Sequence, residues 1–313
     1  MKKQSSSLAP IWQLHLGVLL LGGAGLFAKF IALPALDIII YRSLFSAIFL
    51  FFVLKLTRTS IKLNSQKDYY IVIALGLLAG IHWLTYFMSI QKTSVAVAMI
   101  ALFTYPVFIV ILEPLLHQRR PQLKDLLLSL IVLFGISLLF PNLWQSSNSI
   151  LDTKGELFTS DYLLGLILGV VSALCFALRN IGISKYFNQY SGAQSMFYQL
   201  LVSTLIFLPF LGSMPEELIF DDIGLLILLA ILFTSAPHVL LANALAKISA
   251  KTVGIISFLQ PLYGTLLAII LLSEIPTLTT LIGGTIILLA ALYESITAYG
   301  KQNTNDVAQH SQK

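Results

Sequence analysis

The sequence predicts an all-α polytopic membrane protein of about ten transmembrane helices, arranged as two inverted five-helix repeats. Composition is the first observation: of the 313 residues, 57% are hydrophobic and 11% are charged, whereas soluble domains hold roughly 25% charged residues. The second is a succession of apolar runs, each near the length of about 20 residues that a helix needs to cross a bilayer. The third is an alignment of the two halves of the chain with each other.

The apolar runs follow one another with only short interruptions. The predicted spans are 11–32, 37–56, 69–90, 95–116, 123–140, 162–186, 193–211, 223–247, 252–272 and 277–299. Lys2 and Lys3 precede the first run, as they would in a secretory signal. However, the run that starts at Ile11 is long enough to span, and no convincing small-residue cleavage site follows it. The first run is therefore predicted to stay in the protein as its first helix.

Basic residues predict the orientation in the membrane. Most of them share a side with the N-terminus, namely Lys2, Lys3, Lys55, Arg58, Lys62, Lys67, Arg119, Arg120, Lys124, Lys185, Lys247, Lys251, Lys301 and Lys313. The loops on the other side hold Lys92 and Lys154. Because lysine and arginine concentrate on the cytoplasmic side, both termini are predicted to be cytoplasmic. The predicted location is the plasma membrane, that is, the cell inner membrane.

This orientation divides the chain into five segments. They are a cytoplasmic N-terminal tail (1–10), a first five-helix repeat (11–140), an extracytoplasmic linker (141–161), a second five-helix repeat (162–299) and a cytoplasmic C-terminal tail (300–313). The linker is the one sizeable polar interruption between the predicted spans, which places the division between the repeats there.

The two repeats align without a gap when the sequence is shifted by 155 residues. The shift pairs Lys92 with Lys247, Pro106 with Pro261 and Pro121 with Pro276. Because each repeat has an odd number of spans, the second must enter the membrane upside down relative to the first. Inverted repeats are a recurrent plan of secondary transporters. Exchanging the conformations of two such halves turns an outward-facing state into an inward-facing one, so the repeat predicts transport.

Two stretches resemble a known family. The stretch from His82 to Phe108 (HWLTYFMSIQKTSVAVAMIALFTYPVF) is similar to the third and fourth spans of EamA-type members of the drug/metabolite transporter superfamily. The stretch from Ala242 to Thr277 resembles the ninth-span region of the same family, and Tyr41 with Arg42 fits its second span. The resemblance covers roughly 11–299 and implies that both repeats are EamA-like. It implies movement of small metabolites, often amino acids or related amphipathic solutes, through a central cavity.

The predicted function is therefore a secondary transporter. It moves an amino acid or related amphipathic solute, with export as the predicted direction, by alternating access at a cavity between the repeats. The alternative is a non-transporting membrane channel or helper subunit. An enzyme is not predicted, because the sequence holds no Gly-x-Ser-x-Gly or His-Glu-x-x-His motif and no paired deep carboxylates.

The predicted partners are the small-molecule solute and the lipid bilayer. Coupled protons are one candidate partner, and antiport and facilitated flux are the alternatives to proton coupling. Nucleic acid is excluded, because the basic residues are scattered over short loops and form no cluster on a soluble face. No cofactor and no metal are predicted. Because no phosphate-binding Gly-x-x-x-x-Gly-Lys-Ser/Thr loop occurs, the energy is expected to come from a gradient or from exchange.

Polar side chains deep in hydrocarbon are costly unless they are paired or face water, so they mark candidate cavity positions. Arg42 lies about five residues into the second span, roughly 8 Å from its outer edge at 1.5 Å per residue. Lys29 lies at the matching depth in the first span. Either the two cations attract a substrate carboxylate, or both side chains snorkel to the outer interface.

Aromatic and titratable residues meet in the third span. His82 and Tyr86 are four residues apart and share a face, with Trp83 beside them. They predict an aromatic wall suited to an amphipathic solute. His238 lies at a similar depth in the eighth span, with Asn243 following it. Both histidines are candidates for proton coupling, and the alternative for each residue is core packing.

Two prolines predict kinks near the middle of the membrane. Pro106 and Pro261 remove backbone donors and free the carbonyls of Leu102 and Ser257. The freed carbonyls need a partner, unless the kinks only shape helix packing. The polar neighbours predicted to face the cavity are Tyr105, Gln260 and Tyr263.

Arg179 lies in the cytoplasmic third of the sixth span. Its predicted role is structural, as the partner of an acid such as Glu113 or Glu294. The alternative is that its side chain snorkels to the interface.

Overall fold

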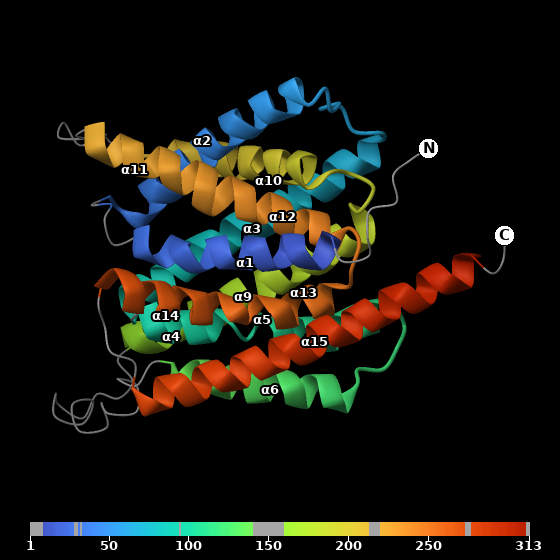
Figure 1. Cartoon of the computed structure of the whole chain (residues 1–313). Coiled ribbons are helices and arrows are strands. Elements are labelled where there is room, and N and C mark those ends of the chain that lie inside the picture. The colour runs from blue at the N-terminus through green and yellow to red at the C-terminus, as the bar shows by residue number, and fades with distance from the viewer. Residues whose placement is uncertain are drawn as a thin grey trace.

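The computed structural model describes residues 9–27, 31, 33–93, 95–139, 160–212, 220–272 and 277–310. Every regular element in these ranges is helical (Figure 1), which confirms the predicted all-α class. Six helical stretches are long and apolar enough to cross a membrane: Leu36–Leu56, Gln66–Lys92, Val97–Leu116, Asp161–Tyr186, Gly192–Phe210 and Ile223–Leu245. Two further apolar helices, Pro10–Gly23 and Leu278–Glu294, are shorter.

The helices of the first half are α1 (Ala9–Phe27), α2 (Ala35–Leu56), α3 (Gln66–Lys92), α4 (Val95–Leu102), α5 (Tyr105–Leu116) and α6 (Leu123–Leu138). Those of the second half are α9 (Ser160–Tyr186), α10 (Gly192–Phe207), α11 (Phe220–Ala230), α12 (Ala236–Leu245), α13 (Ala250–Ser257), α14 (Leu259–Leu272) and α15 (Leu278–His310). A 3₁₀ turn at Leu208–Phe210 extends α10, and a π-helical turn at Ile231–Ser235 joins α11 to α12.

Side-chain caps explain where several helices begin. The Ser65 hydroxyl accepts a hydrogen bond from the backbone N–H of Asp68 at the start of α3. At the start of α10, Ser191 and Gln194 form a capping box, in which each side chain accepts from the other residue's backbone N–H. The Ser249 hydroxyl accepts from the N–H of Thr252 at the start of α13. These caps satisfy amide groups that have no partner inside a helix.

The helices break next to the prolines. α4 ends at Leu102 and α5 starts at Tyr105, so that Pro106 lies in the first turn of α5. In the second half, α13 ends at Ser257 and α14 starts at Leu259. A proline cannot donate to the carbonyl four residues earlier and its ring clashes with that carbonyl, so the helix ends there and a new one starts.

The packing of helices repeats when the two halves are exchanged. α2 packs on α10, and α6 packs on α15 (Figure 1). The extensive contact of α3 with α9 has its counterpart in the contact of α1 with α12. In the same way, the contact of α1 with α14 corresponds to that of α9 with α4 and α5. This exchange is what two structurally equivalent repeats produce.

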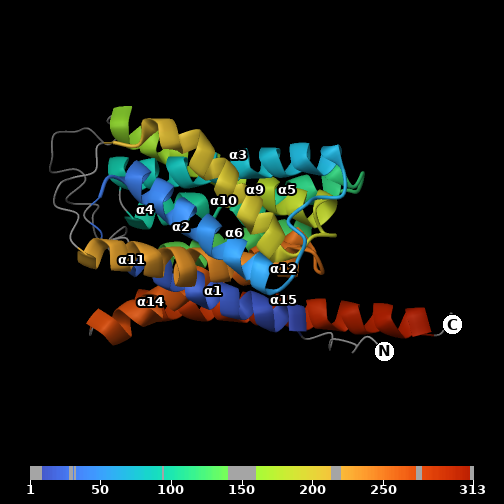
Figure 2. The same ribbon diagram turned by 90° about the horizontal axis from the view of Figure 1, so that it is seen from above.

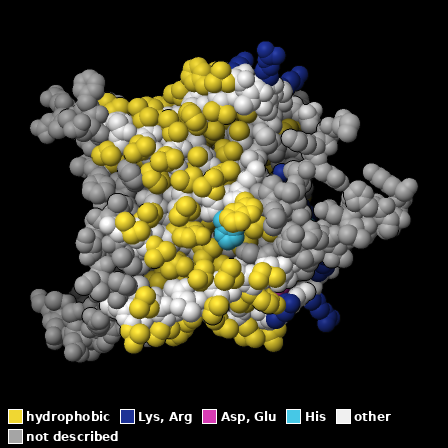
Figure 3. Space-filling model, in the orientation of Figure 1, with side chains coloured by type: hydrophobic (Ala, Val, Ile, Leu, Met, Phe, Trp, Pro, Cys, Tyr) yellow, Lys and Arg dark blue, Asp and Glu magenta, His cyan; other side chains and the backbone are white. Residues whose placement is uncertain are grey.

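The outer surface is apolar around the middle and basic at one end. Large exposed side chains on α6 and α15 include Leu127, Phe134, Leu289 and Tyr293, and Figure 3 shows hydrophobic side chains across the face of the bundle, with lysine and arginine at one edge. We call the edge that carries the exposed Lys55, Lys67, Lys124 and Lys247 the basic end. The start of α1 and the end of α15 lie toward this end (Figures 1 and 2). We call the other edge, with Lys92 and Asp161, the opposite end.

Candidate functional site

An aromatic cluster lies where helices of the two halves meet. His82 of α3 stacks on Phe176 of α9, with ring centroids 4.5 Å apart. Tyr105 of α5 meets Phe176 edge to face at 4.8 Å. Trp83 of α3 meets His238 of α12 edge to face at 5.8 Å. The structure thus brings together four residues predicted from sequence, and adds Phe176, which was not predicted.

His82 is held by Ser172 of α9. The His82 Nδ1 atom lies 2.8 Å from the Ser172 hydroxyl and 3.3 Å from the Ser172 carbonyl oxygen. The Ser172 hydroxyl donates to the His82 carbonyl oxygen at 3.0 Å. Because a carbonyl oxygen only accepts, Nδ1 is assigned as the donor, and the neutral ring then has an acceptor at Nε2. The side chain is buried, so its ring orientation is fixed from both halves.

His238 has the same donor pattern. Its Nδ1 atom lies 2.8 Å from the carbonyl oxygen of Thr234 in the π-helical turn, and this oxygen can only accept. Nε2 of the neutral ring is therefore again an acceptor. π-helical turns are rare and are often found at functional sites, and here the turn ends two residues before Pro237 of α12.

Arg42 of α2 is buried beside the cluster. Its guanidinium carbon lies 4.7 Å from the centroid of the Trp83 ring and 5.7 Å from that of Phe87. Only 7% of the residue is exposed, so the guanidinium is inside the bundle and does not snorkel to the interface. Its Nε and Nη2 atoms are buried and have no hydrogen-bond partner. The matching candidate, Lys29, lies outside the described residues.

Arg179 of α9 is buried in a different way. Its three donor nitrogens bind neutral acceptors: Nε donates to Gln199 at 2.6 Å, Nη1 to the Asn180 side chain at 3.2 Å and Nη2 to the Met196 sulfur at 2.9 Å. The predicted pairing with Glu113 or Glu294 is wrong. Both acids are occupied elsewhere in the bundle, where they bind groups on α13.

The other predicted residues lie in three different places. Tyr86 is half-buried and stacks on His82 at 6.5 Å, so it belongs to the aromatic cluster. The Asn243 side-chain oxygen accepts from the backbone N–H of Gly192 at 2.7 Å, where it holds the start of α10. Gln260 and Tyr263 follow the break in the ninth predicted span, where α14 packs closely on α1 at Gly22.

Residues missed by the sequence analysis come mostly from α9 and the π-helical turn. Ser172, Phe176 and Thr234 contact the cluster but look like ordinary helix residues in the sequence. The signal that could have found Thr234 was Pro237 beside His238, because a proline predicts an irregular turn before it. For Ser172 and Phe176 the sequence carries no comparable signal.

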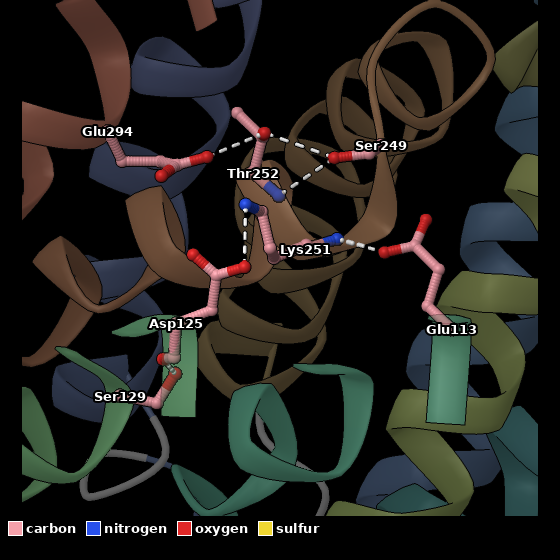
Figure 4. A network of polar contacts seen from close by, with 7 residues as sticks. All are labelled: Glu113, Asp125, Ser129, Ser249, Lys251, Thr252 and Glu294. Carbon is pink, nitrogen blue, oxygen red and sulfur yellow. Dashed lines mark hydrogen bonds and ion pairs between the residues drawn. The ribbon is translucent and has the colours of Figure 1, made fainter. Parts of the chain in front are cut away.

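A polar network joins the two halves at the basic end (Figure 4). The Glu113 carboxylate of α5 accepts from the backbone N–H groups of Ala250 and Lys251, at 2.9 and 2.7 Å, and so caps α13. The Lys251 ammonium forms an ion pair with Asp125 of α6 at 3.1 Å. The Thr252 hydroxyl donates to Glu294 of α15 at 2.7 Å. We call these residues the basic-end network.

A second junction at the basic end joins loops of the two halves. The Tyr190 hydroxyl donates to the Asp68 carboxylate at 2.8 Å and accepts from the backbone N–H of Asn64 at 2.7 Å. The Gln194 side chain donates to the Ser60 carbonyl oxygen at 2.6 Å. Desolvation and the neighbouring Asp68 raise the pKa of the Tyr190 hydroxyl, which keeps it protonated as a donor.

Comparison with known proteins agrees with this architecture. The sequence profile of the EamA-like transporter family matches the chain twice, at residues 8–140 and 163–295. The pseudopaline exporter CntI of Pseudomonas aeruginosa (strain UCBPP-PA14) is 23% identical over 272 residues, which cover 86% of this chain and 88% of that protein. An uncharacterized transporter, YxxF of Bacillus subtilis (strain 168), is 22% identical over 304 residues, which cover 96% and 93%.

A solved crystal structure shares the fold. It superposes with a TM-score of 0.76 at 16% sequence identity, over 94% of this chain and 98% of the other. The apolar membrane-length helices, the exchangeable packing of the two halves and the double match of the family profile lead to one conclusion. The chain belongs to the EamA-like transporter family, within the drug/metabolite transporter superfamily, and is a multi-pass membrane transporter for a small molecule.

Proposed function

We propose that the chain is a secondary transporter that exports an amino acid or a related amphipathic solute by alternating access. The observation that carries the proposal is the buried cluster at the contact of the two halves, where His82, Trp83 and Tyr105 of the first half meet Phe176 and His238 of the second. A site built from both halves changes its exposure when the halves move relative to each other. The cluster therefore binds the solute.

The basic-end network supports alternating access, because its charged residues are not repeated at the equivalent positions of the other half. The shift of 155 residues that aligns the repeats matches Glu113 and Asp125 with Ala268 and Thr280. It matches Lys251 with Ala96, and Glu294 with Leu139. The charged groups of the network thus have uncharged counterparts in the other repeat. We propose that the network closes the basic end and that opening this end requires breaking it.

The orientation follows from charge. We propose ten spans, with the basic end and both termini on the cytoplasmic side of the plasma membrane, because lysine and arginine favour that side. The name of the Pseudomonas aeruginosa relative, an exporter, supports the outward direction. The two histidines support proton coupling, since each has a neutral tautomer with an acceptor at Nε2.

Reconstitution into proteoliposomes tests the proposal. Vesicles preloaded with unlabelled amino acids are expected to accumulate the same amino acid in labelled form by exchange, whereas protein-free vesicles are not. Vesicles with Trp83→Ala are expected to need a higher amino-acid concentration for the same rate of exchange. A channel would give flux that does not saturate and shows no exchange. A helper subunit would give no flux for any of the twenty amino acids or their decarboxylated amines, and either outcome would reject the transporter mechanism.

A further inference from the structure

We infer that the solute carries a carboxylate and that Arg42 binds it through the Nε and Nη2 edge of its guanidinium group. This inference rests on the transporter function proposed above and specifies the chemical class of the solute. It is carried by four observations: the burial of Arg42, its unpartnered donors, the occupation of the described acids elsewhere, and the aromatic rings beneath it.

The unpartnered donors have a particular geometry. Of the nitrogen atoms of Arg42, Nε and Nη2 are buried without a hydrogen-bond partner. These two atoms form one edge of the planar guanidinium, and their parallel N–H bonds match the two oxygens of a carboxylate. An arginine with 7% exposure that keeps such an edge free in a membrane protein is in an unfavourable state until an anion fills it.

The protein itself does not supply that anion among the described side chains. No described carboxylate oxygen lies within 4.0 Å of the Arg42 nitrogens; the ion pairs found are Lys92 with Asp161 and Lys251 with Asp125. The remaining acids whose side chains the structure describes are Asp37, Asp68, Glu113 and Glu294, each of which accepts hydrogen bonds from other groups. The positive charge of Arg42 is therefore left for a ligand.

Arg179 shows that this chain can satisfy a buried arginine internally. Its Nε, Nη1 and Nη2 atoms all donate to side chains of α9 and α10. Arg42 is also an arginine and is similarly buried, yet its Nε and Nη2 atoms have no hydrogen-bond acceptor. The contrast separates a structural arginine from one whose binding groups remain available.

The rings beneath Arg42 orient it. Trp83 and Phe87 are four residues apart on α3, so they lie on the same face one turn apart, and the guanidinium lies over both. A cation over the face of an aromatic ring is attracted to it, which fixes the guanidinium while leaving its edge free. Trp83 also contacts His238, so a solute bound at Arg42 lies next to the aromatic cluster.

A phospholipid phosphate offers similar oxygen atoms, so the test separates two sources of the anion. The measurement is the melting temperature of the purified protein in detergent, with L-leucine, L-phenylalanine or benzoate, each against its carboxamide. A further arm adds phosphatidylglycerol. The variants are Arg42→Gln, Arg42→Lys and a matched control, Lys55→Gln, which removes an exposed charge from the same helix.

At least one carboxylate is expected to raise the melting temperature while its amide does not, because a ligand that binds the folded form stabilises it. Arg42→Gln is expected to weaken that binding by about tenfold or more, since hydrogen bonds to charged groups are strong. Arg42→Lys should retain part of it, and Lys55→Gln all of it. The inference is overturned if the amides stabilise equally, if Arg42→Gln binds like the wild type, or if phosphatidylglycerol alone gives the Arg42-dependent shift.

A second measurement needs no ligand. The melting temperature of ligand-free Arg42→Met is expected to exceed that of the wild type, because a buried charge without an anionic partner is removed. Ligand-free Arg179→Met is expected to melt lower, because Gln199 loses its partner. If no carboxylate binds and Arg42→Met is no more stable than the wild type, Arg42 is an ordinary structural residue and the inference fails.

The two proposals fail in different ways. If amines or neutral solutes cross vesicles equally with the wild type and Arg42→Gln, the transporter function stands and the carboxylate assignment falls. If carboxylates bind at Arg42 but none crosses the membrane, the binding site stands and the transporter mechanism falls.

Discussion

The guanidinium of Arg42 lies 4.7 Å from the ring centroid of Trp83, with its Nε and Nη2 atoms free of protein partners. Trp83 in turn meets His238 of the other half edge to face. One tryptophan thus links the buried cation of α2 with the second half. If Arg42 binds the carboxylate of the solute, as we propose, Trp83 connects that binding to the contact between the halves.

Replacement of Trp83 by alanine is expected to weaken solute binding by about tenfold or more. A desolvated cation–π contact contributes about 2 kcal/mol, and 1.4 kcal/mol is a factor of ten. Trp83→Phe keeps an aromatic face and should lose much less. The concentration dependence of exchange in proteoliposomes measures both, and equal affinities for the alanine and phenylalanine variants would contradict the role of the ring.

The close contact of α1 with α14 predicts a strong effect at Gly22. A methyl group there would lie 2.9 Å from the Gln260 carbonyl oxygen and 3.0 Å from the Gly264 nitrogen, and these backbone atoms cannot move aside alone. Gly22→Ala is therefore expected to lower the melting temperature. Small residues permit such approaches between membrane helices.

Gly224 provides the matched control for Gly22, because a methyl group there would meet no atom within 4 Å. Gly224→Ala is expected to leave the melting temperature unchanged or to raise it, because alanine is more stable than glycine in a helix by about 0.5–1 kcal/mol. If both alanine variants melt at the same temperature, the α1–α14 contact is looser than described.

Part of the fold and of the site could be predicted from sequence because it depends on residues that are close together in the chain. The helix breaks at Leu102 and Ser257 follow from the prolines four residues later, and the all-α class follows from composition. His82 and Tyr86 were predicted because they share one helix face, and Trp83 because it lies beside them. Which residues of the second half meet that face depends on packing between helices, so Phe176 was missed.

Other predictions concerned the hydrogen-bond partners of polar side chains, which are set by the packing of helices against one another. Arg179 was expected to pair with an acid, but Gln199 and Met196 lie closer in the folded chain. Asn243 was predicted to face the cavity, which stays a prediction; what the sequence did not indicate is that its side-chain oxygen accepts a hydrogen bond from Gly192. A polar residue in an apolar helix signals that some partner exists, and its sequence position does not say which.

The basic-end network predicts a shift in the conformational equilibrium. The reporter is a cysteine placed at Ser257 in a background with Cys175→Ala, and it is labelled by a reagent that enters from the basic end. Glu113→Gln removes the charge that caps α13, so it is expected to increase this labelling. A carboxylate near a helix N-terminus contributes about 0.3–1 kcal/mol or more, so the open state should gain several-fold. Lys92→Met, which breaks an exposed ion pair at the opposite end, should leave this labelling unchanged.

Unchanged labelling with Glu113→Gln, or an equal increase with Lys92→Met, would separate the network from closure of the basic end. In that case the network would only stabilise the fold, and a lower melting temperature without a change in labelling would identify that role.

A reversible cross-link across the basic-end network tests alternating access most directly. In the Cys175→Ala background, Glu113→Cys and Lys251→Cys are joined by a short reducible bifunctional reagent, and exchange of a labelled amino acid is measured in proteoliposomes. Cross-linking is expected to stop exchange and reduction to restore it, with either single-cysteine variant unaffected by the reagent. Undiminished exchange by the cross-linked protein would contradict the account, because the solute would then cross without the halves separating at this end.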